Sequence, residues 1–152
     1  MKVINRKARF DYEIGEKIEA GIELKGAEVK SAKAGQADLS RSFVKFLPSK
    51  FRNQAEAWVL GMQIFPYKHA NNTEYDPSRS RKLLLHQREI VALQSKMRQS
   101  RRTLVPTALY TRSGRIKLEL ALVRGKKKYE KREVLKKREW RQKGKNGGDG
   151  GS

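Results

Sequence analysis

The stretch TLVPTALYTRSGRIKLELALV, residues 103–123, decides the fold because it predicts an antiparallel hairpin. Ser113-Gly114 is a favourable two-residue turn, and it separates two apolar runs, residues 104–110 and 116–123. Side chains alternate between the two faces of a strand. In the second run one face carries Ile116, Leu118, Leu120 and Leu122, and the other carries Lys117, Glu119, Ala121 and Val123.

Upstream of the hairpin, residues 1 to about 70 predict strands with one helix between them. The first strand follows from a period of two, in which Ile18, Ala20, Ile22 and Leu24 alternate with Glu19, Gly21, Glu23 and Lys25. Gly26 ends this run, and residues 27–34 are good helix formers with Gly35 as the stop. Two further strands, residues 42–47 and 55–64, are expected to pair as a hairpin around a polar loop, residues 48–54. Lys50 and Arg52 stand at the tip of that loop.

Residues 76–100 predict a helix. Asp76 can cap free backbone N–H groups, and Pro77 already has a helical φ. Leu83, Leu84, Ile90, Val91 and Met97 then recur close to helical spacing. With at least five short strands and a helix, an antiparallel barrel that is closed or nearly closed would leave no long exposed edge. An oligonucleotide-binding-like barrel is one such fold.

The charge of the chain indicates a polyanionic partner. Its 152 residues include 36 Lys and Arg against 16 Asp and Glu, a formal net charge of +20. Such an excess repels itself and is normally neutralised by a polyanion, with nucleic acid as the first candidate and an anionic membrane as the second. No apolar run of membrane-spanning length is present. The chain has no cysteine, which excludes disulfides and thiolate metal sites, and only His69 and His86 offer imidazole.

The C-terminal residues differ sharply from the rest. Residues 124–145 hold twelve basic and three acidic side chains, and the last nine residues are rich in glycine and lack apolar side chains. We expect residues 124–152 to form a basic tail that is disordered when free. Residues 129–143 contain no proline or glycine, and their like charges oppose a helix only until phosphates neutralise them. The tail is therefore expected to become helical on RNA.

Catalytic patterns are missing from the sequence. Glu19 and Glu23 lie on one face of a predicted strand and could serve acid–base chemistry or hold a metal, but no His, Cys or third carboxylate stands beside them. We interpret them as surface charges, and we expect no enzyme activity, no cofactor and no metal. Aromatic residues among the cations, such as Tyr12, Tyr67, Tyr129 and Trp140, can stack on unpaired RNA bases. For Phe10, Tyr12 and Trp58, packing in the core is at least an equal alternative.

Several motifs, in order, resemble the SmpB (small protein B) family of bacterial tmRNA-binding proteins. They cover the chain from about residue 5 to residue 140: NRKA (5–8), IEAGI (18–22), GAEVKS (26–31), DPSRSRKLLLHQRE (76–89), LVP (104–106), LY (109–110) and GKKKYEKR (125–132). The resemblance implies a mainly β fold, an oligonucleotide-binding-like antiparallel barrel with about three flanking helices over residues 1–123, followed by the basic tail over residues 124–152.

The resemblance also implies a function. Members of the family bind the tRNA-like domain of tmRNA and deliver it to ribosomes stalled without a stop codon (trans-translation), while the tail enters the empty mRNA channel near the decoding centre of the small subunit. Elongation factor Tu would be met indirectly, through alanyl-tmRNA. By motif position, the implied RNA-binding residues are Asn5, Arg6, Lys7, Glu19, Leu84 and Lys117. The implied ribosome-binding tail residues are Lys126, Lys127, Lys128, Tyr129, Glu130, Lys131, Arg132 and Trp140.

Each carried-over role has a plainer alternative. Leu84 could be a core residue at helical spacing, and Glu19 could accept hydrogen bonds from RNA or only orient a neighbouring cation. Lys117, opposite the apolar face, suits phosphate contact. The sequence also departs from the family: Tyr129 and Glu130 replace a His and an Asp, the chain after Trp140 turns to glycine early, and the loop at residues 48–54 is longer than typical.

Two other functions are compatible with the sequence. A structural ribosomal protein would share the charge and the tail but would bind ribosomal RNA without tmRNA. An RNA-processing enzyme would act through Glu19 and Glu23. We expect a monomer without membrane attachment, and the very short segment before Asn5 favours the bacterial cytoplasm, with an organellar stroma or matrix as the alternative.

Overall fold

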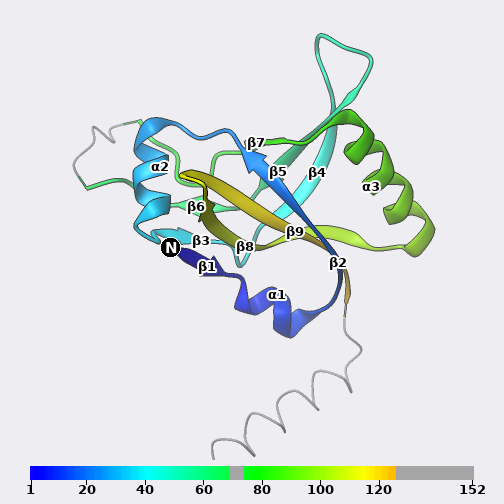
Figure 1. Cartoon of the computed structure of the whole chain (residues 1–152), viewed down its shortest axis with the longest axis horizontal. Helices are drawn as coiled ribbons and strands as arrows, with labels where there is room; N and C mark the ends of the chain where they lie inside the picture. The colour runs from blue at the N-terminus through cyan, green and yellow to red at the C-terminus, as the bar shows by residue number, and fades with distance from the viewer. Residues whose placement is uncertain (69–73, 126–152) are drawn as a thin grey trace, which may run out of the picture.

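A hairpin of two long strands lies at the centre of the fold (Figure 1). The structure, a computed structural model, describes residues 1–68 and 74–125. In it β8 (Thr103–Arg112) pairs antiparallel with β9 (Arg115–Gly125). Ser113 and Gly114 have φ of 52° and 76°, the left-handed conformation that a tight hairpin turn needs. The predicted hairpin is confirmed, and β9 continues two residues beyond the expected end of the barrel at residue 123.

The described strands build one large antiparallel sheet with the order β1-β8-β9-β2-β7-β5-β4, and a small second sheet of two short strands. The remaining elements, in chain order, are β1 (Lys2–Ile4), α1 (Arg6–Asp11), β2 (Tyr12–Ile22), α2 (Gly26–Lys33), β3 (Ala37–Asp38), β4 (Phe43–Pro48), β5 (Ala55–Leu60), β6 (Gln63–Ile64), β7 (Arg81–Leu84) and α3 (Gln87–Ser100). The last strand in the order, β4, contacts β8 near the other edge, so the sheet curls into a nearly closed barrel.

The inner face of the curled sheet holds the main core. Leu118, Leu120, Leu109 and Val59 are completely buried there. Ala32 of α2 and Ile90 and Leu93 of α3 join the same cluster, so these two helices cover the interior of the barrel. The predicted inward face of Ile116, Leu118, Leu120 and Leu122 is confirmed.

Helix α1 instead packs on the outer face of the sheet. Its Ala8 forms a second cluster with Val105, Ala121 and Val123. These two β9 residues belong to the face opposite the core, and they are apolar because α1 covers them. Glu119 and Lys117 lie on the same face of β9, beyond the part that α1 covers.

The predicted helix over residues 76–100 is wrong in its first half. Asp76 starts a turn, with its Oδ1 accepting a hydrogen bond from the Ser78 N–H at 2.9 Å. Residues 81–84 form β7, in which Arg81 and Leu83 are buried while Leu84 is exposed. That alternation is the period of a strand. Helix α3 begins only at Gln87, where the Glu89 side chain accepts from the His86 N–H at 3.0 Å.

Two other expectations need correction. The strand expected over residues 55–64 is divided into β5 and β6 by Gly61, which has a φ of 74°. A Cβ at this position would lie 2.3 Å from the Arg41 carbonyl oxygen, so only glycine fits. At the N-terminus, β1 and α1 were not expected, and β2 starts at Tyr12 rather than near Ile18. The helix predicted over residues 27–34 is confirmed as α2, one residue earlier at residues 26–33, and it ends before Gly35 (φ 76°).

Candidate RNA-binding surface

Five residues, one on each of the neighbouring strands β7, β2, β9, β8 and β1, form a row across the open outer face of the sheet. Gly21 on β2 is paired on one side with Leu84 and on the other with Lys117. Lys117 is paired with Tyr110 on β8, and Tyr110 with Lys2 on β1. Directly paired residues project from the same face of a sheet. We call Leu84, Gly21, Lys117, Tyr110 and Lys2 the outer row.

Leu84 lies against β2 because Gly21 has no side chain. A Cβ on Gly21 would lie 3.1 Å from the Leu84 Cβ and 3.3 Å from its Cδ1. With glycine there, Leu84 lies flat beside the backbone and remains 52% exposed. The alternative that Leu84 is a core residue is therefore wrong. An exposed leucine next to a lysine offers an apolar surface for a base or a ribose beside a charge for a phosphate.

Glu19, two residues before Gly21 on β2, bonds to Tyr110 in the outer row and to Arg112 beside it. Its Oε2 accepts a short hydrogen bond from the Tyr110 hydroxyl and forms an ion pair with Arg112 Nη1 at 2.9 Å. The Arg112 guanidinium also lies 5.9 Å from the centre of the Tyr110 ring. Partial burial, the hydrogen bond to Glu19 and the Glu19 charge together raise the pKa of Tyr110 to about 12. Glu19 thus orients a tyrosine and an arginine that border the row.

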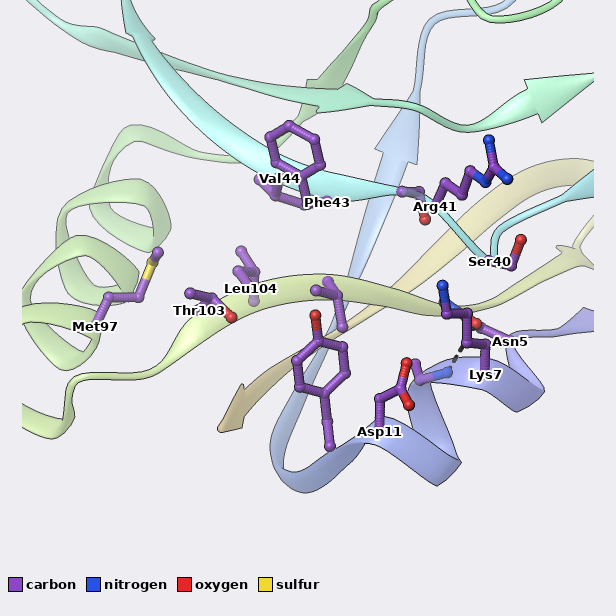
Figure 2. Close-up of a pocket in the computed structure, with 14 residues that line it drawn as sticks. Asn5, Lys7, Asp11, Ser40, Arg41, Phe43, Val44, Met97, Thr103 and Leu104 are labelled. Atoms are coloured by element: carbon purple, nitrogen blue, oxygen red, sulfur yellow. Dashed lines mark hydrogen bonds between the residues drawn. The ribbon is translucent and has the colours of Figure 1, made fainter. Parts of the chain in front are cut away.

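Asn5 and Lys7 lie in a different place, beside a cavity of about 400 Å³ next to α1 (Figure 2). Lys7 and Asp11 border it on the helix, with Ser40 and Arg41 on the opposite side. This cavity reaches Val105 on β8, while the outer row crosses β8 at Tyr110. Val105, the nearest to Tyr110 of the β8 residues that line the cavity, lies five residues from it, about 17 Å along the strand at about 3.4 Å per residue.

The side chain of Asn5 is fully occupied by the fold. It is only 3% exposed, it caps α1 by accepting from the Ala8 N–H at 3.0 Å, and its amide donates to the carbonyls of Leu39 and Pro106. Arg6 and Lys7, which follow it, are exposed. The structure therefore brings Glu19, Leu84 and Lys117 together and separates them from residues 5–7.

The DPSRSR motif forms a buried ionic cluster with α2. Glu28 is buried, and both of its oxygens meet guanidinium groups: Arg81 Nε donates to Oε2 at 2.8 Å, Arg79 Nε donates to Oε2 at 3.1 Å, and Arg79 Nη2 pairs with Oε1. Tyr75 completes the group, with its hydroxyl 3.1 Å from Glu28 Oε2 and donating to the Ile64 carbonyl at 2.7 Å. We call Glu28, Tyr75, Arg79 and Arg81 the Glu28 cluster.

Electrostatics in the Glu28 cluster favour the charged carboxylate. Burial by itself would raise the pKa of Glu28, but hydrogen bonds from Arg79, the Lys25 N–H and Arg81 outweigh it and lower this pKa from 4.5 to about 2. Burial and the Glu28 charge raise the pKa of Tyr75. No local sequence pattern pairs Glu28 with arginines about fifty positions away. The local sequence shows only that Glu28 is a charged residue within a short helix, on the face that also carries Ala32.

The remaining predicted residues lie outside the described part of the chain. These are His69 and the tail residues Lys126, Lys127, Lys128, Tyr129, Glu130, Lys131, Arg132 and Trp140. Over residues 1–68 and 74–125, no three His, Asp or Glu side chains gather as metal ligands would. In those same ranges, no helix combines the length and the apolar character needed to cross a bilayer.

Comparison with known proteins gives one consistent family. A family model described as SmpB protein matches residues 2–147. The SsrA-binding protein of Malacoplasma penetrans is 46% identical over 137 residues, which cover 90% of each chain. That of Chlorobium chlorochromatii is 51% identical over 138 residues, covering 90% of this chain and 84% of the relative. A solved structure described as "tmRNA-SmpB: a journey to the center of the bacterial ribosome" matches with a TM-score of 0.67 and 42% identity, over 88% of this chain and 94% of that one.

Proposed function

The chain belongs to the SmpB family, and on that premise we propose that it binds tmRNA and acts in the rescue of stalled bacterial ribosomes. The relatives at 46% and 51% identity are named for binding SsrA, which is tmRNA. The matching solved structure joins SmpB, tmRNA and the ribosome. These names describe binding, and we propose that the chain works by binding, without catalysis, in the bacterial cytoplasm and as a monomer.

The outer row is our candidate for contact with the tRNA-like domain. The observation that carries this proposal is that Glu19, Leu84 and Lys117, which come from three strands and were each singled out by motif position, lie on one open face. Lys2, Lys117 and Arg112 can neutralise phosphates. Leu84 and the Tyr110 ring offer apolar surface between these charges, as recognition of non-helical RNA requires.

Glu19 has a positioning role in this proposal. Its carboxylate is turned toward Tyr110 and Arg112, so that it directs two RNA-facing groups and limits the local excess of positive charge. Asn5 is likewise a positioning residue. Its three hydrogen bonds fasten α1 to β8 and to the backbone at Leu39, which sets the direction of the exposed Arg6 and Lys7.

For the tail we propose ribosome contact in the mRNA channel through Lys126, Lys127, Lys128, Tyr129, Glu130, Lys131, Arg132 and Trp140. A net charge of +9 over residues 124–145 suits a channel lined by ribosomal RNA. Delivery would also involve elongation factor Tu, indirectly through alanyl-tmRNA. Deleting residues 126–152 should leave tmRNA binding largely intact and abolish peptide tagging on stalled ribosomes; joint loss of both would contradict a division of labour between barrel and tail.

The experiment that tests the function is a binding titration across salt concentrations. The full chain is titrated with the tRNA-like domain of tmRNA and, in parallel, with an ordinary elongator tRNA. A preference for the tRNA-like domain that persists as salt rises indicates recognition of shape and bases in addition to phosphates. Equal affinities that fall together with salt would contradict the proposal and favour a structural ribosomal RNA-binding protein.

A further inference from the structure

The loop between β4 and β5 carries an exposed aromatic side chain between two cations. This hairpin projects beyond the body of the molecule (Figure 1). Phe51, near its tip, is 93% exposed, whereas Leu84 and Val91 are 52% and 53% exposed. Lys50 and Arg52 on either side are exposed as well, and residues 49–54 contain no acidic side chain.

The loop is closed at its base, which limits the positions that its tip can take. The Ser49 N–H donates to the Gln54 carbonyl at 2.9 Å, and the Phe51 N–H donates to the Ser49 hydroxyl at 3.3 Å. A cavity of about 560 Å³ lies beside it, bordered by Phe51 and Arg52 on the loop and by Lys82 and His86 on the other side. Phe51 borders this cavity but does not fill it.

The loop lies at the end of the sheet where Leu84 projects. β7 runs antiparallel to β5, with Arg81 opposite Val59 and Lys82 opposite Trp58. The C-terminal end of β7, Leu84, is therefore directed toward the start of β5, where the loop joins the sheet. Lys82, which projects from the same face of β7 as Leu84, borders the cavity. An RNA that lies along the outer row and extends past Leu84 would reach the loop.

We propose that residues 50–52 form a second contact for the same RNA, in which Phe51 stacks on an unpaired base and Lys50 and Arg52 bind the phosphates on either side. This inference rests on the proposed function, because its ligand is the RNA that binds the outer row. Phenylalanine has no hydrogen-bonding group, so the contact holds any base that is not paired. Lys82 already pairs with Glu56 at 2.7 Å, which leaves Arg52 as the freer cation at the cavity.

The test compares F51L, which keeps an apolar side chain but removes the stacking ring, with F51W, which keeps a ring. The full chain is titrated with the tRNA-like domain of tmRNA. F51L should bind about tenfold more weakly, while F51W should bind at least as well as the wild type and lose fluorescence on adding RNA, relative to the wild type. F65L, the same change at another exposed phenylalanine, is the matched control and should bind as the wild type does.

The cations are tested separately by K50A/R52A, which should reduce the slope of log affinity against log salt by about one to two. Wild-type affinity in both F51L and K50A/R52A would overturn the inference. If F51L instead impairs tagging on ribosomes without changing RNA affinity, the loop contacts the ribosome, and the inference fails in that way. In each case, the preference of the wild type for the tRNA-like domain over an elongator tRNA shows whether the proposed function itself holds, and K117A shows whether the outer row binds the RNA.

Discussion

The outer row and the Glu28 cluster use the same kinds of side chain for opposite purposes. In the Glu28 cluster one carboxylate pairs with two arginines and a tyrosine hydroxyl completes the group, with Glu28 and Arg81 1% and 0% exposed. On the outer row and at its border, Arg112 pairs with Glu19 but its side chain is still 65% exposed, Lys2 is exposed and Lys117 is partly exposed. The first arrangement satisfies its charges internally, and the second leaves positive charge for a ligand.

This difference shows that, in a strongly basic protein, some cations stabilise the fold and others are available to bind a ligand. Arg79 and Arg81 fasten β7 and the turn before it to α2, and Arg81 is completely buried, so its charge serves the fold. Because β7 also presents Leu84 on the opposite face, the buried cluster holds the strand that carries part of the outer row. Damage to the cluster should therefore appear as lost stability, and damage to the row as lost RNA affinity.

The largest expected effect is that of Glu28→Gln. This change leaves Arg81 buried without its counter-charge, so the free energy of unfolding should fall by about 3–5 kcal/mol in urea denaturation. The control is Glu16→Gln, which removes an exposed pair with Lys96 at 2.8 Å and should cost less than about 1 kcal/mol. Equal losses in the two variants would mean that burial does not distinguish the pairs.

The Glu28 cluster also predicts a dependence of stability on pH. The pKa of Glu28 is lower in the folded chain, about 2, than its ordinary value of 4.5. The stabilisation is therefore complete above pH 4.5 and is lost as the pH falls toward 2, a difference of about 3 kcal/mol. Unfolding measured from pH 7 to pH 2 should show this loss in the wild type. E28Q should lack that part of the acid dependence. Parallel curves of unfolding free energy against pH for the wild type and E28Q would contradict the assignment of this dependence to Glu28.

The outer row predicts a change in affinity with little change in stability. Lys117→Ala should weaken binding of the tRNA-like domain about five- to tenfold and reduce the salt slope by about one. Leu84→Ala should weaken binding without changing the slope, because it removes no charge. Both should unfold within about 0.5 kcal/mol of the wild type. Lys33→Ala, at the exposed end of α2, is the control; an equal effect there would indicate binding by diffuse charge alone.

Sequence reasoning recovered those features that depend on neighbouring residues. The β8–β9 hairpin was predictable because a turn and two alternating runs lie within 23 residues. The alternation around Ile18 and Lys117 correctly placed Glu19 and Lys117 away from the core. The error over residues 81–84 arose because adjacent leucines suit one side of a helix as well as the two sides of a strand, and only pairing with β2 and β5 decides between them.

Features that depend on distant residues were not predictable in this way. Asn5 was identified only by its motif, and its bond to Pro106 spans 101 positions. Glu28 meets Arg79 and Arg81 across 51 and 53 positions. That Leu84, Gly21 and Lys117 are neighbours follows from the strand order β9-β2-β7, which no local pattern contains. Motif resemblance marked these residues, and the sheet explains why they belong together.

The smallest expected effect tests whether Glu19 positions the row without itself binding RNA. Tyr110→Phe removes the hydroxyl that donates to Glu19 and keeps the ring, at a cost of about 1 kcal/mol in stability. The pKa of Tyr110 is raised from 10 to about 12, so this contribution is complete below pH 10 and is lost as the pH rises through 12. Because the pKa of Tyr75 is raised as well, ultraviolet titration should find one fewer late-ionising tyrosine in Y110F than in the wild type. If Glu19 acts by positioning, Y110F and E19Q should weaken RNA binding by similar, roughly twofold factors; a much larger loss in E19Q alone would show that the carboxylate itself contacts RNA.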